Sequence, residues 1–426
     1  MVYLPYCNVR SAIVLIRMFV SILVAGALLF AAAFVSANEE HEGSASDENG
    51  EGRTFRYLYL DGEHYRILSR VSTNAFVNGR HNHSEEVLNR IAVHVTDLED
   101  GSGRLNVNWQ ISRENTEGAA AFALGREYNV EYERDEFGRD TVPAGAPRPM
   151  VRDVPLFPER PLEVGDTWAG EGREVVDLRE GFGIDGVEEF RIPVSYEYLG
   201  TEDEDGIVYD VFELRYNMFY RIPGPRQGLY PERITGYSIQ RHRWDREFGR
   251  PQAYREEFEI NYDLSDGDTW TWRGTAEARI TDTSFDDREE VLGELRQRFE
   301  REDIDIIDGE RGITISLEDI GFQPDSTVLR AGEEESLAEI AEALRDYDEG
   351  ELLITGHTAL AGTAEGRREL SEARARVVAE YLIENGVRAS DAVLYRGVGA
   401  DEPVADNRTE AGRRRNRRVE FTILED

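Results

Sequence analysis

The chain has 426 residues and a formal net charge of −37, and all 49 of its basic residues are arginine because the sequence contains no lysine. This charge excludes nucleic acid as an expected partner, since contacting phosphates requires a positive surface, and the lack of lysine excludes Schiff-base chemistry. A chain of this length indicates two or three domains.

Residues 1–37 have the features of a signal peptide. Arg10 and Arg17 precede an uncharged run over 18–37, which ends in small residues directly before an acidic sequence. The run is also long enough to span a bilayer, so an uncleaved N-terminal membrane anchor is the alternative. Either way, we expect export to the periplasm or cell envelope. The single cysteine, Cys7, precedes this run, so the exported part is expected to have no disulfide, thiol nucleophile or cysteine metal site.

Two segments of contrasting composition follow. Residues 38–52 are acidic and small, and we expect a flexible tether because they lack apolar groups to bury. Residues 53–283 alternate apolar and polar positions with period two, as in Ile91, Val93 and Val95. Asp-Gly turns separate such runs, so the pattern predicts an antiparallel β-rich region, either a sandwich or an open barrel.

The β-rich region contains no recognisable catalytic constellation. A Pro-rich passage near 143–162 can divide it into two units. His81 and His83 lack further ligands at metal-binding spacing, so we expect no metal, no cofactor and no enzymatic activity. We interpret the acids near Gly267 as a turn and four tryptophans as core: Asp263, Asp266 and Asp268, and Trp168, Trp244, Trp270 and Trp272. The region is expected to present a surface to an envelope protein.

The period changes after the β-rich region. Val291, Leu292, Leu295 and Phe299 recur on one face of a helix, which predicts a linker helix within residues 284–308. Its apolar face has to pack on a neighbouring domain.

Residues 309–426 alternate strands with helices. Ile313 and Ile315 belong to an alternating strand, and later strands are separated by two amphipathic helices. This order predicts an α+β domain with a mixed sheet and helices on one face. On the longer helix we expect the apolar stripe at Leu370, Ala373, Val377 and Tyr381.

Five short motifs follow one another along this domain, and their order and spacing together form a recognisable pattern. They are Phe322-Gln323-Pro324-Asp325-Ser326, Gly356-His357-Thr358, Leu370-Ser371-Glu372-Ala373-Arg374-Ala375, Gly397-Val398-Gly399 followed by Pro403, and Asn407 with Gly412-Arg413 and Asn416-Arg417-Arg418-Val419-Glu420. Residues 310–426 thereby resemble the OmpA-like peptidoglycan-associated domain family.

The resemblance implies non-covalent binding of the peptide stem of peptidoglycan, at the zwitterionic end of its diamino acid. In the family, an aspartate after Gly-His-Thr and an arginine in Leu-Ser-x-x-Arg-Ala hold that group. An ammonium needs a carboxylate, and the fork of an arginine suits a carboxylate. Arg374 matches the family arginine.

Two positions depart from the family pattern. Ala359 stands where the family has the aspartate, and Arg367 replaces a family asparagine. Three outcomes follow: another acid such as Glu365 or Asp401 substitutes, the cognate stem peptide differs, or the fold persists without the ligand.

The resemblance also marks further binding residues. These are Gly356, His357 and Thr358 of the second motif, and Arg413 and Arg418 of the last. The arginines near the C-terminus are expected to be largely structural, with a minor role toward stem carboxylates. We therefore predict a peptidoglycan-binding envelope protein, with an envelope scaffold that has lost wall binding as the alternative.

Overall fold

The computed structural model describes residues 52–424, apart from 99–100, 115–120, 205, 282–287, 300, 302, 310, 319, 321, 324–325, 331 and 348–349. The signal peptide expected at 1–37 and nearly all of the tether expected at 38–52 lie outside this range. The chain forms a β-rich unit (Met1–Trp109 and Tyr128–Thr281) and a C-terminal unit (Gln110–Glu127 and Asp282–Asp426). No helix in the described part of the chain is both long and apolar enough to cross a membrane.

The β-rich unit is built almost entirely from strands, and all of them except β5 and β6 are long. They are β1 (His64–Val77), β2 (Arg80–Asp97), β3 (Gly103–Glu114), β4 (Phe122–Arg134), β5 (Asp140–Thr141), β6 (Val151–Arg152), β7 (Thr167–Asp177), β8 (Val187–Glu204), β9 (Ile207–Arg221), β10 (Pro231–Asp245), β11 (Arg250–Leu264) and β12 (Thr269–Thr281), with one short helix, α2 (Leu178–Phe182).

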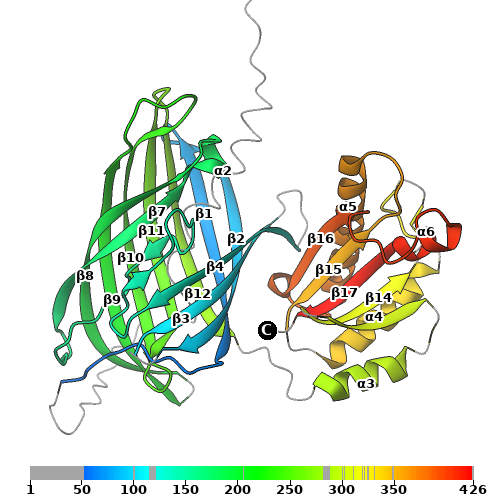
Figure 1. The fold of residues 1–426 in the computed structure, drawn as a ribbon, viewed down its shortest axis with the longest axis horizontal. Helices are drawn as coiled ribbons and strands as arrows, with labels where there is room; N and C mark the ends of the chain where they lie inside the picture. The colour runs from blue at the N-terminus through cyan, green and yellow to red at the C-terminus, as the bar shows by residue number, and fades with distance from the viewer. Residues whose placement is uncertain are drawn as a thin grey trace, which may run out of the picture. The chain divides into compact units, whose positions relative to one another are not determined.

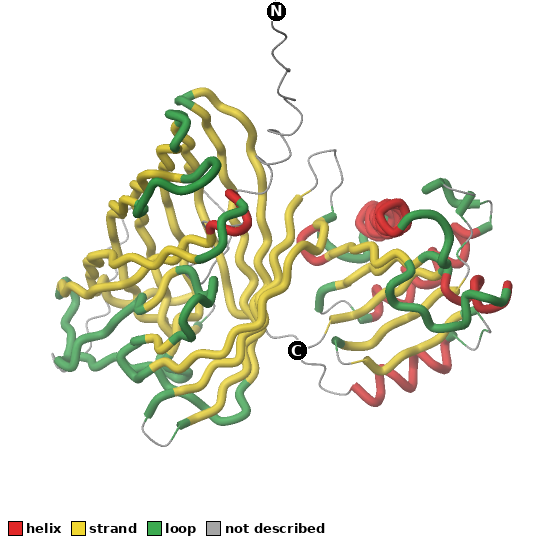
Figure 2. Tube along the Cα trace, turned by 45° about the horizontal axis from the view of Figure 1, so that its top comes forward, coloured by secondary structure: helices red, strands yellow, loops and turns green. Residues whose placement is uncertain are grey.

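These strands form one continuous antiparallel ladder. Each of β7 to β12 is hydrogen-bonded to the next, β12 pairs with β1, and β1 pairs with β2. The expected sandwich is therefore wrong for these strands, because two separate sheets would break the ladder. The single sheet is strongly curved (Figures 1 and 2).

Two interior glycines fit this curvature. A Cβ on Gly236 would lie 2.2 Å from the Glu259 carbonyl oxygen, and one on Gly274 would lie 2.2 Å from the Ser72 carbonyl oxygen. Such positions tolerate only glycine, because the neighbouring strand approaches too closely for any side chain. The sheet can therefore bend where a larger residue would hold the strands apart.

An aromatic core fills the inside of the curved sheet. Phe157 packs on Phe55, Phe212 and Trp244, with ring centroids 5.7, 5.2 and 4.6 Å away. Phe157 belongs to the Pro-rich passage, and Leu162 in the same passage exchanges backbone hydrogen bonds with Arg53. The passage therefore packs against the sheet, and β7 to β12 continue in the same unit beyond it.

The C-terminal unit has α3 (Arg288–Arg298), β13 (Ile304–Gly309), β14 (Gly312–Glu318), α4 (Glu333–Asp346), β15 (Leu352–His357), α5 (Ala364–Glu384), η2 (Ser390–Ala392), β16 (Val393–Gly399), α6 (Glu410–Asn416) and β17 (Arg418–Leu424). Its strands pair in the order β13, β14, β17, β15, β16, in which the pairing of β15 with β16 is parallel and the others are antiparallel. Beyond β16, the first residues of β4, Phe122 and Ala123, add a short parallel pairing. The expected α+β domain with a mixed sheet is confirmed.

One hydrophobic core joins this sheet to its helices. Ile340 of α4 and Leu382 of α5 are buried in it together with Ile315 and Phe421 of the strands. Leu295 of α3 is buried in the same core, so the apolar face expected within 284–308 packs inside the C-terminal unit.

Candidate functional site

Two motif glycines let α5 lie directly on β15 and β16. Gly356 and Gly397 are partners in the parallel ladder. A Cβ on Gly356 would lie 2.1 Å from the Ser371 carbonyl oxygen, and a Cβ on Gly397 would lie 2.2 Å from the Glu372 nitrogen. These glycines therefore set the position of the helix that carries Arg374.

Ser371 fastens α5 to the end of β16. Its buried hydroxyl donates to the Arg368 carbonyl over 2.8 Å and accepts from the Gly399 N–H over 2.9 Å. The apolar stripe expected on this helix is wrong, because the buried residues are Ser371, Ala375, Val378, Ala379 and Leu382. Close contact with the glycines selects small residues on the buried face, which a search for large apolar side chains does not detect.

The loop after β15 is held by three segments of the chain. The Thr358 N–H donates to the Gly399 carbonyl over 2.8 Å, and the Leu360 N–H donates to Oδ1 of Asn407 over 3.1 Å. Arg367, which replaces the family asparagine, donates from Nη1 to the Gly362 carbonyl over 2.7 Å. The second, fourth and last motifs are thus joined around one loop.

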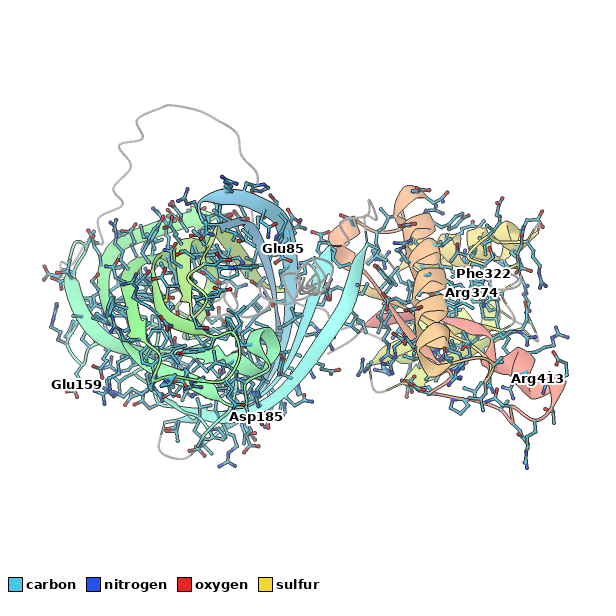
Figure 3. All side chains as sticks on the ribbon, turned by 90° about the horizontal axis from the view of Figure 1, so that it is seen from above. Glu85, Glu159, Asp185, Phe322, Arg374 and Arg413 are labelled. Atoms are coloured by element: carbon cyan, nitrogen blue, oxygen red, sulfur yellow. The ribbon has the colours of Figure 1, made fainter. Side chains whose placement is uncertain are left out.

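Arg374 brings the first motif to the same region. Its Nε donates to the Ser326 carbonyl over 3.0 Å, and Nη2 lies 3.5 Å from the Gln323 carbonyl oxygen. The guanidinium carbon lies 4.8 Å from the centroid of the Phe322 ring, in cation–π range. Figure 3 shows Arg374 on its helix beside Phe322. The cation is therefore held by a backbone loop and an aromatic face.

The position of the family aspartate holds an uncharged, buried side chain. Ala359 is 8% exposed. Of the two acids expected to substitute, Asp401 accepts a hydrogen bond from Nη2 of Arg368 over 2.9 Å. Glu365 is exposed in the first turn of α5.

His357 belongs to the opposite face of the sheet. Successive residues of a strand point to opposite faces, so Gly356 faces α5 and His357 faces away from it. His357 is buried, and its Nε2 lies 3.2 Å from Oε2 of Glu420. Burial acts to raise the pKa of Glu420, but the hydrogen bond from His357 and the charges of His357 and Arg418 outweigh it and lower that pKa to about 2.

The two C-terminal arginines are engaged within the domain. Arg418 is buried and donates from Nε to Oε1 of Glu420 over 2.8 Å. Arg413 donates from Nη2 to Glu410 over 2.6 Å and from Nη1 to the Asn407 carbonyl over 3.0 Å. These contacts fix α6 and β17.

The structure therefore divides the expected site residues. Arg374 lies with the Phe322–Ser326 motif, whereas His357 and Arg418 lie on the other face with Glu420. Sequence reasoning did not assign roles to Phe322 and Glu420. Both residues belong to the motifs. Glu420 is a charged residue between the buried Val419 and Phe421, and this position predicts a carboxylate that is paired with a cation.

The polar groups singled out in the β-rich unit have structural contacts. His81 bonds through Nε2 to the Ser84 hydroxyl over 3.1 Å. Asp266 accepts from the Asp268 N–H over 3.0 Å, as in a turn. Within the described residues, no group of three or more His, Cys, Asp or Glu side chains is arranged to hold a metal ion. Three of the four tryptophans are buried, and Trp168 packs half-buried on the aromatic core.

Comparison with known proteins gives matches to the C-terminal region. The model of the OmpA family matches residues 321–417. The peptidoglycan-binding protein ArfA of Mycobacterium tuberculosis is 36% identical over 104 residues, which are 24% of this chain and 32% of ArfA. The outer-membrane lipoprotein YfiB of Pseudomonas aeruginosa is 41% identical over 88 residues, which are 21% of this chain and 52% of YfiB. This chain thus spans about a third to a half of these relatives.

Solved structures match over a similar extent. An outer membrane protein from Borrelia burgdorferi B31 is 35% identical, covering 29% of this chain and 97% of that chain with a TM-score of 0.25. The cell wall anchor of the type VI secretion system (T6SS) from Pseudomonas aeruginosa is 29% identical, covering 33% of this chain and 100% of that chain with a TM-score of 0.28.

Proposed function

We propose that the chain is an exported, non-enzymatic envelope protein whose C-terminal unit binds the peptide stem of peptidoglycan. The match of residues 321–417 to the OmpA family supports this proposal. The names of its relatives, a peptidoglycan-binding protein and an outer-membrane lipoprotein, support both parts of the proposal. The observation that carries it is the placement of Arg374, the match to the family arginine, against the first motif.

Arg374 is suited to receive a carboxylate. The hydrogen bond to the Ser326 carbonyl and the ring of Phe322 orient the guanidinium. The 3.5 Å contact from Nη2 to Gln323 is the weaker one, and it is the contact that a stem carboxylate would displace. Such a charge-assisted hydrogen bond contributes about 1.5–3 kcal/mol.

The site lacks an evident carboxylate to bind the ammonium group of the stem diamino acid. Ala359 offers no carboxylate, and Asp401 is already bonded to Arg368. These contacts favour a second candidate function, an envelope scaffold that keeps the OmpA-like fold without wall affinity. In either case the β-rich unit presents its surface to an envelope protein, and nucleic acid is excluded by the net charge of −37.

Co-sedimentation of the full chain with purified sacculi tests the two functions. Wild-type protein is expected to pellet with the wall, and Arg374→Ala to weaken binding by at least tenfold, in line with the loss of about 1.5–3 kcal/mol. Arg376→Ala is the matched control, because Arg376 lies on the same helix and pairs with Glu380 over 3.9 Å. Its binding should equal wild type.

Ala359→Asp distinguishes the candidates further. If the wild type does not pellet but Ala359→Asp does, the site is intact and the scaffold function holds. If neither binds, the assignment of the site to Arg374 is wrong.

A further inference from the structure

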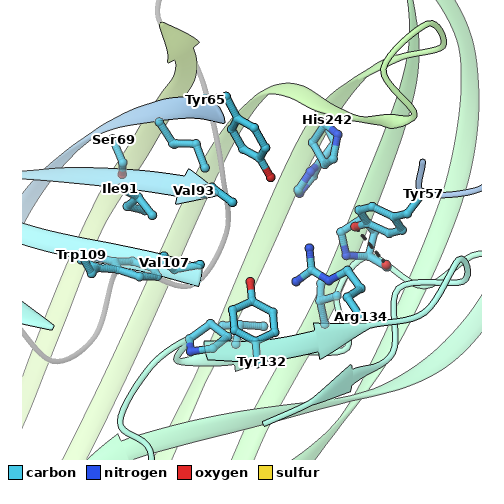
Figure 4. A pocket seen from close by; sticks show the side chains of 16 residues that line it. Tyr57, Tyr65, Ser69, Ile91, Val93, Val107, Trp109, Tyr132, Arg134 and His242 are labelled. Atoms are coloured by element: carbon cyan, nitrogen blue, oxygen red, sulfur yellow. Dashed lines mark hydrogen bonds between the residues drawn. The ribbon is translucent and has the colours of Figure 1, made fainter. Parts of the chain in front are cut away.

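The inside of the β-rich unit contains a cavity that the proposed function does not use. It has a volume of about 60 Å³ and lies among residues of β1, β2, β3, β4 and β10 (Figure 4). A neighbouring cavity of about 20 Å³ shares Tyr57, Tyr65 and Arg134 with it. Because about 10–15 Å³ holds one water molecule, the larger cavity accommodates roughly four to six water-sized groups.

The wall of the cavity has an apolar side and a polar side. Ile67, Ile91, Val93 and Val107 supply an aliphatic side. The polar side carries Tyr57, Tyr65, Tyr132, Arg134 and His242. An apolar wall with a few converging polar groups is the usual composition of a small-molecule site.

Three polar atoms in this wall are buried without a hydrogen-bond partner in the described structure. They are Oγ of Ser69, Nε1 of Trp109 and Nδ1 of His242. The three residues are only 3%, 6% and 2% exposed. Each such atom costs about 1–3 kcal/mol when nothing satisfies it, so three of them around one cavity indicate a polar occupant.

The protonation of His242 is determined by its neighbours. Nε2 lies 2.9 Å from Oε1 of Gln240, while the Gln240 amide nitrogen donates to the Ser238 hydroxyl over 3.0 Å. Oε1 is therefore an acceptor, and Nε2 must carry the proton. Burial lowers the pKa of His242 to about 3, so the ring is neutral and Nδ1 is an acceptor.

The cavity as a whole is electrically neutral. Arg134 donates from Nε and Nη2 to the two oxygens of Asp140, over 2.7 and 3.2 Å. Tyr57 donates weakly to the Pro155 carbonyl over 3.5 Å, drawn as the dashed line in Figure 4. A charged ligand would have to enter this buried site without a counterion, which is strongly unfavourable.

We propose that this cavity binds a small neutral amphipathic molecule that carries a hydroxyl or amide group. The polar group supplies a donor to Nδ1 of His242 and an acceptor to the indole N–H of Trp109, and the Ser69 hydroxyl can take either role. The apolar part packs against Ile67, Val93 and Val107.

Fluorine NMR of the full chain labelled with 5-fluorotryptophan tests the proposal. The five tryptophans give separate reporters, and Trp109→Phe assigns the resonance of the one that lines the cavity. Propan-1-ol and propionamide are the neutral probes, propionate and propylammonium are charged probes of similar size, and n-butane lacks the polar group. We expect a saturable shift of the Trp109 resonance with the two neutral polar probes alone, while the buried Trp272, which does not line the cavity, serves as an internal control.

A second variant keeps the test decisive. Ser69→Ala removes the hydroxyl without adding an atom and should weaken propan-1-ol binding about three- to tenfold, the equivalent of one hydrogen bond. Water as the sole occupant would leave the Trp109 resonance unchanged by every probe, and this result would overturn the proposal. Equal binding of n-butane and propan-1-ol would overturn it as well.

Discussion

Two glutamates buried inside the β-rich unit should make its stability fall as pH rises. Glu174 accepts from the Tyr216 hydroxyl over 3.1 Å, and Glu256 accepts from the Ser238 hydroxyl over 2.6 Å. Burial raises the pKa of Glu174 to about 8, the hydrogen bond from Tyr216 opposes this, and the charge of Glu256 adds to it. Burial likewise raises the pKa of Glu256 to about 7.

The sign and size of the effect follow from proton linkage. Between the ordinary glutamate pKa of 4.5 and about 8, the folded state binds more protons than the unfolded state, so stability falls across this window. It is unaffected below 4.5 and levels off above about 8. At about 1.4 kcal/mol per unit, Glu174 alone corresponds to a loss of roughly 3–5 kcal/mol, which is large against a typical total of about 5–15 kcal/mol.

Glu174→Gln removes the ionisable proton while keeping an acceptor for Tyr216. We expect the free energy of unfolding to rise by about 3–5 kcal/mol at pH 8.5 and to change little at pH 4.5. All five tryptophans lie within the β-rich unit, so their fluorescence during urea unfolding reports on that unit. Glu171→Gln is the control, because Glu171 lies exposed on the same strand and pairs with Arg191 over 2.8 Å. Parallel pH profiles for wild type and Glu174→Gln would refute the reasoning.

Two further outcomes are expected in the C-terminal unit. Gly397→Ala should destabilise this unit by about 1–3 kcal/mol through overpacking, measured by hydrogen exchange, since its Cβ would meet the Glu372 nitrogen at 2.2 Å. Gly293→Ala, in α3 with nothing within 4 Å, should instead stabilise it by about 0.5–1 kcal/mol, and equal effects would contradict the packing account. Because the pKa of Glu420 is lowered to about 2, its contribution to stability is present above pH 4.5 and is lost as pH falls toward 2. Glu420→Gln should therefore reduce exchange protection of β15 and β17 at pH 6 and remove this acid dependence. An unchanged protection profile would show that His357 and Arg418 do not depend on that carboxylate.

Local patterns in the sequence were enough to predict much of the architecture. Alternation along β8 predicts the buried Ile192, Val194 and Tyr196, and Asp-Gly pairs predict the hairpin turns between long strands. The five motifs of the C-terminal region identify the family because their glycines, Ser371 and Arg374 are each tied to one geometric requirement. These are short-range properties, carried by the order of the residues themselves.

The closure of the sheet and the two candidate sites depend on contacts between distant residues. The pairing of β1 with β12 joins residues about 200 positions apart, and no local pattern distinguishes it from a sandwich. The cavity exists because Ser69, Trp109 and His242, each an ordinary inward-facing strand residue, converge on one volume. Burial then makes their unpaired atoms costly, so their significance arises only when the tertiary fold removes water from them. The sequence by itself determined which elements form and which family motif they carry, whereas the tertiary fold decided which side chains share a dry environment.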